Sequence, residues 1–134
     1  MTAKVQELAV RYGAAWAEHD LDKIMAMHTD DTVFHLHGSG EPAIGQAAVR
    51  EAFAAGMAQW PDIRFERSAV YTGADHFITQ YRISATTPDG RRILCDGADV
   101  FAIEDGFVKR KDTYLDWPAL QQQLATDLAS AAAN

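Results

Sequence analysis

The sequence predicts an α+β domain in which a curved, mixed or antiparallel sheet wraps around three N-terminal helices. Apolar residues at helical spacing fill most of the first half of the 134-residue chain. Four long strand-like segments separated by tight turns fill most of the second half. The length is ordinary for one domain, so residues 1–134 are interpreted as a single domain shaped like an open cone.

The helices are placed by apolar residues that recur at spacings of three and four. Thr2 is the expected cap of the first helix, and Asp20 is the expected cap of a shorter second helix over 21–27. A third helix is expected over 46–57, and Pro118 suits the first turn of a tail helix. The inward stripe of the first helix consists of Val5, Leu8, Tyr12, Ala15 and Trp16.

The strands are placed by alternating apolar residues and by the turn sequences between them. A first strand over 32–37 ends in a glycine-rich turn. The other four strands form a meander, with turns rich in Gly, Asp and Pro between successive segments. These four strands are expected at 63–72, 77–86, 92–103 and 107–115.

Composition restricts the class of partner. The formal net charge of -7 argues against nucleic acid, and the one basic cluster, at 109–111, is expected to be a solvated surface patch that includes Lys111. No apolar run approaches the ~18 residues of a membrane helix, and the N-terminus lacks the apolar core of a signal peptide. The single Cys95 fits a reducing compartment. We therefore expect a cytoplasmic protein without a nucleic-acid or membrane partner.

Two polar residues stand where apolar ones are expected. Strand alternation places Asp99 on the same face as Phe101 and Ile103, whose large side chains point inward. Tyr12 lies on the inward stripe of the first helix. A buried carboxyl group needs a hydrogen bond or a proton, and a buried tyrosine usually finds a partner for its hydroxyl. A neutral Asp99 and Tyr12 aimed at one point would form an oxyanion hole.

Aromatic residues are available to line the mouth of the cone, as they do in many small-molecule sites. The alternative is that most of them fill the core. The residues concerned are Tyr12, Trp16, Phe34, Phe53, Trp60, Tyr81 and Phe101.

The pair His35-x-His37 allows three interpretations. If the strand alternates regularly, both side chains face solvent or a dimer interface. A bulge in the glycine-rich stretch would instead turn His37 inward, where it could act as a general base. A metal site formed by His35, His37 and Glu41 is the third interpretation. His19 and His28 lie at helix ends, where an imidazolium suits the helix dipole, so both are expected to be structural.

Long stretches of the chain resemble a known superfamily. MTAKVQELAVRYGAAWAEHDLDKIMAMHTDDTVF and GSGEPAIGQAAVREAF are similar to the first half of bacterial ketosteroid isomerases. GADVFAIEDGFVKRKDTYLDW is similar to the D-x-F…G-x-V…Y strand pair of the nuclear-transport-factor-2-like superfamily, which includes SnoaL-like polyketide cyclases and limonene-epoxide hydrolases. The resemblance implies the cone-shaped fold and a homodimer that binds a small hydrophobic ligand without a cofactor or metal.

The resemblance also implies roles for individual residues. Tyr12 falls at the position of the oxyanion-hole tyrosine of ketosteroid isomerases, and Asp99 at the position of their protonated, hydrogen-bond-donating aspartic acid. Leu36 stands where the isomerases keep their general base. Thr113 stands at the acidic position of the last strand of the cyclases and epoxide hydrolases, with Asp112 facing outward. Both family bases are therefore expected to be replaced, unless a bulge shifts either strand by one residue.

Two functional hypotheses follow. In the first, the protein is an enzyme that isomerises or cyclises a small hydrophobic ketone, with Tyr12 and Asp99 stabilising the oxyanion and His37 or His35 moving the proton. In the second, it is a non-catalytic ligand-binding or dimerisation module of the same fold that has lost its base. The expected substrate-binding residues are Trp16, Phe34, Leu36, Phe53, Trp60, Tyr81, Phe101 and Thr113.

Overall fold

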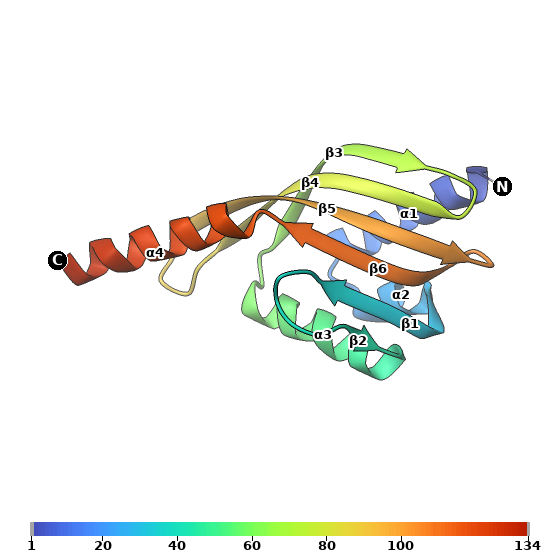
Figure 1. Ribbon diagram of the computed structural model, residues 1–134, viewed down its shortest axis with the longest axis horizontal. Coiled ribbons are helices and arrows are strands. Elements are labelled where there is room, and N and C mark those ends of the chain that lie inside the picture. Colours follow the sequence, from blue (N-terminus) through green and yellow to red (C-terminus); the bar gives the residue numbers. More distant parts are fainter. Residues whose placement is uncertain (1, 134) are drawn as a thin grey trace.

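The computed structural model describes the backbone of residues 2–133 and the side chains of residues 4–125. A curved six-stranded sheet carries three of the four helices against one of its faces, and the fourth helix projects beyond the end of the sheet (Figure 1). This arrangement confirms the predicted α+β cone. The helices are α1 (Thr2–Ala17), α2 (Leu21–Ala26), α3 (Gln46–Gln59) and α4 (Trp117–Ala133).

The sheet is mixed, with the strand order β2-β1-β6-β5-β4-β3. Strands β1 and β6 pair in parallel, and the other neighbouring strands pair antiparallel. The N-terminal strand thereby joins the edge of the C-terminal meander and closes part of the cone. The strands are β1 (His28–Leu36), β2 (Ala43–Ile44), β3 (Arg64–Thr72), β4 (His76–Thr86), β5 (Arg92–Glu104) and β6 (Phe107–Leu115).

Most element boundaries agree with the sequence prediction to within one or two residues, with two exceptions. Strand β1 begins at His28, four residues earlier than expected, and the short strand β2 was not predicted. The Asp20 cap is confirmed, because its Oδ1 accepts a hydrogen bond of 3.1 Å from the backbone N–H of Lys23. The capping role expected of Thr2 concerns a side chain outside the described ones.

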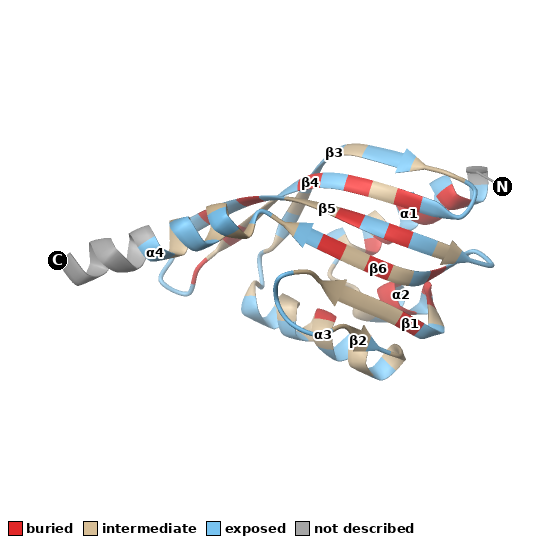
Figure 2. Cartoon of the chain, viewed as in Figure 1, coloured by how far each residue is buried: buried red, intermediate tan, exposed pale blue. Residues whose placement is uncertain are grey.

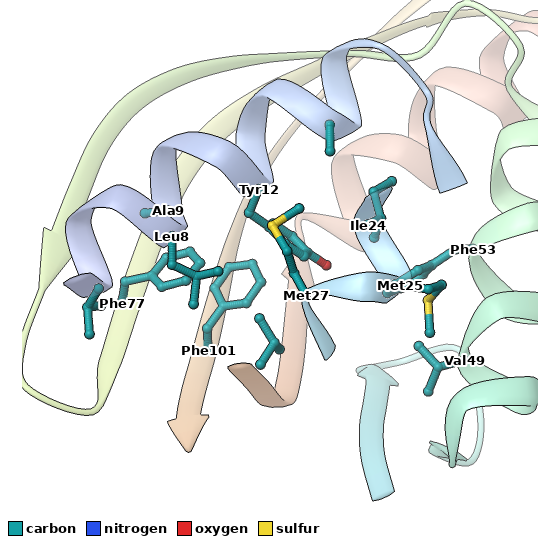
Figure 3. Close-up of a cluster of buried hydrophobic side chains, with 13 residues drawn as sticks. Leu8, Ala9, Tyr12, Ile24, Met25, Met27, Val49, Phe53, Phe77 and Phe101 are labelled. Carbon is teal, nitrogen blue, oxygen red and sulfur yellow. The ribbon is translucent and has the colours of Figure 1, made fainter. Parts of the chain in front are cut away.

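The core lies between α1–α3 and the inner face of the sheet. Alternate residues of β4 and β5 are buried and exposed, so one face of these strands packs inward (Figure 2). Phe77 and Phe101 stack at a centroid distance of 4.0 Å beneath Leu8 of α1 (Figure 3). No helix among the described residues is long and apolar enough to cross a membrane.

A bulge in β6 decides which of its charged residues faces inward. Ala102 pairs with Arg110 and Ile103 pairs with Val108, so Lys109 is an extra residue in the ladder. Before the bulge the even-numbered Val108 faces inward, and beyond it the odd-numbered residues do. Lys111 is therefore buried, with only 6% of its surface exposed. The prediction that Lys111 belongs to a solvated surface patch is therefore wrong.

Candidate active site

A cavity of about 670 Å³ lies between α1 and the inner face of the sheet. This volume is in the usual range for small-molecule sites. The aromatic residues in its wall include Trp16, Phe65, Phe77 and Phe101. The polar residues in its wall include Tyr12, Thr79, Tyr81, Asp99 and Lys111. A second hollow of about 600 Å³ on β3–β5 is lined mostly by exposed polar side chains and contains none of the predicted catalytic residues.

The ammonium group of Lys111 is the most unusual charge in this wall. Its Nζ lies 3.8 Å from Oδ2 of Asp99 and makes no hydrogen bond to any residue that the structure describes. Burial lowers the pKa of Lys111 below its ordinary value, and the negative charge of Asp99 opposes this shift. Five aromatic rings surround the nitrogen. The distances from Nζ to their centroids are 4.4 Å for Trp16, 4.9 Å for Phe53, 5.2 Å for Tyr12, 5.5 Å for Phe101 and 5.7 Å for Phe34.

The carboxyl group of Asp99 is held by two hydroxyl groups. Tyr81 donates a hydrogen bond of 2.8 Å and Thr113 donates one of 2.7 Å, both to Oδ1. The other oxygen faces Lys111. Gly97 lies opposite Tyr81 in the ladder, and a Cβ at Gly97 would come within 2.8 Å of the Tyr81 ring, so the glycine leaves room for that ring. Asp99 was predicted to donate a hydrogen bond to the ligand, whereas it accepts both of these bonds.

The hydroxyl of Tyr12 bonds to a buried histidine. It lies 3.0 Å from Nε2 of His28, whose Nδ1 lies 2.8 Å from Oγ1 of Thr32. Burial, together with the positive charge of Lys111, lowers the pKa of His28 to about 3, so the imidazole is neutral near pH 7. The prediction that His28 is an imidazolium at a helix end is therefore wrong, because its ring is neutral and His28 is the first residue of β1. Burial also raises the pKa of Tyr12 well above its ordinary value, so the hydroxyl keeps its proton.

The indole of Trp16 is a further donor in the cavity wall. Its Nε1 is buried and meets no hydrogen-bond geometry within the described part of the chain, although it lies close enough to the Tyr12 hydroxyl to oppose the rise in the pKa of Tyr12. The ammonium of Lys111 and the hydroxyl of Tyr12 lie at the same end of the cavity as this indole, with the Lys111 Nζ over the Trp16 ring. Buried donors are normally satisfied by protein, water or ligand. This end of the cavity therefore suits an oxygen atom that accepts hydrogen bonds.

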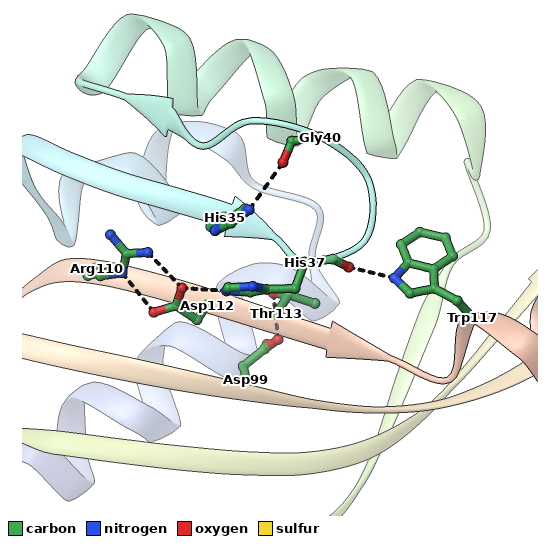
Figure 4. A network of polar contacts seen from close by, with 8 residues as sticks. All are labelled: His35, His37, Gly40, Asp99, Arg110, Asp112, Thr113 and Trp117. Atoms are coloured by element: carbon green, nitrogen blue, oxygen red, sulfur yellow. Dashed lines mark hydrogen bonds and ion pairs between the residues drawn. The ribbon is translucent and has the colours of Figure 1, made fainter.

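The two predicted histidines lie on the opposite face of the sheet. Nε2 of His37 is 2.8 Å from Oδ1 of Asp112, and Nε2 of His35 is 3.1 Å from the backbone oxygen of Gly40 (Figure 4). Arg110 donates two further hydrogen bonds to Asp112, of 2.8 and 3.0 Å. The bulge that would turn His37 into the cone is absent from β1 at this point, since the pairing runs in register over residues 33–36.

This outer cluster contains the atoms that could hold a metal ion. Ligand atoms of His35, His37 and Asp112 lie within 4.8 Å of one another, whereas Glu41 is not part of the group. Arg110, however, already occupies both oxygens of Asp112. A cation at this position would face a neighbouring guanidinium, which opposes metal binding.

The predicted substrate-binding residues divide into three groups. Those in the cavity wall are Trp16, Tyr81 and Phe101. Those behind the wall are Phe34 and Phe53, which flank the Lys111 ammonium, and Thr113, which holds Asp99. Those outside the wall are Leu36 and Trp60, both half-buried.

Two residues of the site were placed elsewhere by the sequence analysis, Lys111 in a surface patch and His28 at a helix end. Lys111 lies two residues before Thr113 on one strand, and this spacing was a usable signal, because alternate residues of a strand share a face. His28 gave no such signal, since the sequence does not show that β1 begins there.

Comparison with known proteins agrees with this architecture. The SnoaL-like domain family matches residues 9–111 of the chain. TerC, co-crystallised with polyporic acid, is 17% identical over 89% of this chain and 96% of its own, with a TM-score of 0.78. A structure assigned to the SnoaL-like polyketide cyclases, from Jannaschia sp. CCS1, is 18% identical over 90% of both chains, with a TM-score of 0.81.

A third structure, a protein from Catenulispora acidiphila DSM 44928, has a ketosteroid isomerase-like fold and was solved in complex with trimethylamine. It is 14% identical over 81% of this chain and 84% of its own, with a TM-score of 0.73. At these identities the similarity to solved structures shows the fold alone. A search of curated protein sequences gives no match.

Proposed function

The chain belongs to the SnoaL-like domain family, and we propose that it is an enzyme that isomerises or cyclises a small hydrophobic ketone by acid–base chemistry. The single observation that carries this proposal is the Lys111 ammonium. It is buried in the cavity wall, 3.8 Å from Asp99 and without a hydrogen bond to any described residue. A buried charge whose counter-charge lies 3.8 Å away without a hydrogen bond contributes little stability, and perturbed ionisable groups are enriched at functional sites.

The substrate oxygen would bind at the end of the cavity where Tyr12, Trp16 and Lys111 meet. When a proton leaves the carbon next to a ketone, negative charge develops on the oxygen, and donors placed in advance stabilise it. Tyr12 can donate its proton to that oxygen if His28 donates from Nε2 to the Tyr12 oxygen, as a neutral imidazole can do in one of its tautomers. In this proposal Tyr12 keeps the role expected from the sequence, that of stabilising the oxyanion, and Lys111 is a second group that stabilises it.

The proton would be moved by Asp99. Because Tyr81 and Thr113 both donate to Oδ1, the second oxygen remains available on the side of Lys111 and the cavity. A carboxylate at this position supplies the base that Leu36 cannot supply. His35 and His37 are poorly placed for the same task, since their partner Asp112 lies on the outer face of the sheet. This assignment replaces the hydrogen-bond-donating role expected of Asp99.

The alternative function is a ligand-binding module without turnover. It is favoured by one observation, namely that the two positions at which relatives are expected to keep a base hold Leu36 and Thr113. The two functions share the binding site and differ in whether Asp99 moves a proton. A parent protein that binds 2-naphthol but shows no turnover of ketones that fit the cavity would favour the module.

The proposal is tested by titrating the protein with 2-naphthol, a phenol that imitates an enolate and fits an aromatic cavity. We expect Tyr12→Phe and Lys111→Met to weaken binding about tenfold or more, because each removes a donor to the ligand oxygen, and one hydrogen bond to a charged group contributes roughly 1.5–3 kcal/mol. His37→Ala on the outer face is the matched control and should bind as the parent does. Equal affinity in all four proteins would contradict the proposal.

A further inference from the structure

We propose that Lys111 is also a covalent nucleophile, which forms a Schiff base with a carbonyl compound bound in the cavity. The inference rests on the proposed function, because that function brings a ketone oxygen to the end of the cavity where the Lys111 nitrogen lies. The nitrogen is in the wall of the cavity, and no hydrogen bond to a described residue holds it. A nucleophile that must approach a carbonyl carbon needs this freedom.

The four lysines of the chain lie in very different surroundings. Lys23 and Lys109 are exposed beside carboxylates, and the hydrogen bonds that they donate to Glu18 and Glu104 respectively raise the pKa values of these two lysines. Lys4 is exposed as well. Lys111 is the buried one, and burial lowers its pKa. A desolvated lysine in an apolar pocket is a recognised way to obtain a neutral, nucleophilic amine.

The surroundings of the nitrogen suit the product as well as the reactant. A protonated Schiff base carries a positive charge on the same nitrogen, and the rings of Trp16, Phe53 and Tyr12 lie around that position. The negative charge of Asp99 lies 3.8 Å away. A cage that accommodates an ammonium ion therefore also accommodates an iminium ion, so covalent bond formation does not leave a new charge unbalanced.

The chemical step balances without any further reactant. The Lys111 ammonium gives a proton to the Asp99 carboxylate, and the neutral amine then attacks the carbonyl carbon to form a carbinolamine. The amine nitrogen keeps one proton, and its other proton together with the one held by Asp99 leaves with the carbinolamine oxygen as water. The product is a protonated iminium, and Asp99 returns to its carboxylate form. The iminium then withdraws electrons from the neighbouring carbon, as the ketone oxygen would in the non-covalent mechanism.

The test is to incubate the protein with benzaldehyde and sodium cyanoborohydride, which reduces an iminium to a stable secondary amine, and to map the benzyl label by mass spectrometry. Near pH ~7 we expect Lys111 to be labelled at least about tenfold faster than Lys23 or Lys109, since each unit of pKa difference changes the amine fraction about tenfold. The labelling rate at Lys111 should level off at a lower pH than the rates at the two surface lysines.

Two variants keep the result interpretable. Lys111→Arg keeps a cation in the cage but cannot form an imine, so its label should be confined to the other lysines. Lys109→Arg is the matched control, because Lys109 is exposed and lies outside the cavity wall. This variant should leave labelling at Lys111 unchanged. Labelling of the surface lysines with Lys111 unlabelled would overturn the inference. If 2-naphthol still binds the parent and depends on Tyr12 in that case, the proposed function stands and only the covalent step falls.

Discussion

Two charged clusters on opposite faces of β6 show how burial changes the meaning of the same residue types. On the inner face, Lys111 and Asp99 have side chains only 7% and 9% exposed and lie 3.8 Å apart. On the outer face, Arg110 and Asp112 are 42% and 16% exposed and are joined by two hydrogen bonds. Residues 110 and 111 are adjacent in sequence, so the bulge at Lys109 alone decides which of them enters the cone.

This comparison shows that the inner pair is poorly explained as a stabilising salt bridge. The outer pair is partly screened by solvent but has good hydrogen-bond geometry, which lowers the pKa of Asp112 despite the opposing effect of its burial. The inner pair loses its hydration and gains no hydrogen bond between its members. A buried pair of this kind contributes little net stability, whereas removal of one partner is costly. Its presence is better explained by a ligand that completes it.

The largest expected effect concerns the pH dependence of folding stability. His28 is on the inner face, and its pKa falls to about 3 in the folded protein from 6.5 in the unfolded chain. Between these two pH values the unfolded chain binds one more proton than the folded protein. The contribution of the neutral His28 to the free energy of unfolding is therefore fully present above pH ~6.5. It decreases as the pH falls toward ~3, by up to about 5 kcal/mol in total. Urea unfolding as a function of pH measures this loss. His28→Asn should flatten the curve in this window, and an unchanged curve would contradict the buried, neutral imidazole.

The next effect compares the two aspartates directly. Asp99→Asn leaves the Lys111 charge buried without a counter-charge and should lower the free energy of unfolding by about 3–5 kcal/mol at neutral pH. Asp112→Asn, its counterpart on the outer face, should cost about 1 kcal/mol or less, because solvent reaches that cluster. Urea denaturation of both variants makes the comparison. Equal losses in the two variants would remove the distinction between the faces.

Tyr12→Phe should have an intermediate effect on stability. The change removes the hydroxyl that bonds to Nε2 of His28 and leaves a buried nitrogen unpaired, at a cost of about 1–3 kcal/mol. Thermal or urea unfolding measures it. Thr32→Val, at the other end of the same chain of hydrogen bonds, is the matched variant, and the two losses should be non-additive in the double variant. Additive losses would mean that the three side chains do not act as one network.

The smallest effect is expected at His37. Its ring is 29% exposed, bonds to Asp112 and stacks on Tyr114 at 4.2 Å. His37→Gln should change the free energy of unfolding by less than about 1 kcal/mol and should leave 2-naphthol affinity unchanged. Calorimetric titration together with urea unfolding checks both. A large loss of affinity would show that the outer face communicates with the cavity.

The fold could be predicted well because its signals are local. Helical spacing in α1, the capping Asp20 and the turn before β6 each depend on a few neighbouring residues. In that turn, Asp105 and Gly106 have φ values of 52° and 82°, as a tight hairpin requires. The order of these elements, with helices first and a meander of long strands after them, then predicted a curved sheet wrapped around the helices.

The site was predicted less well because it depends on register. Tyr12 and Asp99 were found from their place among apolar residues, and Tyr81 and Thr113 were named as site residues. That these two bond to Asp99, and that His28 bonds to Tyr12, was not predicted, because these contacts join residues of different elements. One extra residue at Lys109 reverses the parity of β6, and no local feature of the basic run marks it. The predicted inward position of Thr113 was the one signal that could have placed Lys111 on the inner face, because Lys111 lies two residues before it on the strand.

The role of the Lys111 ammonium can be read from the absorbance spectrum of bound 2-naphthol near pH ~7, in the parent and in Lys111→Met. If the buried ammonium of Lys111 serves to hold a ligand oxyanion, the parent binds the naphtholate form and its spectrum shows that form, whereas the variant binds only neutral naphthol. A neutral spectrum in the parent, identical to that of the variant, would contradict the claim that the buried charge of Lys111 serves the ligand.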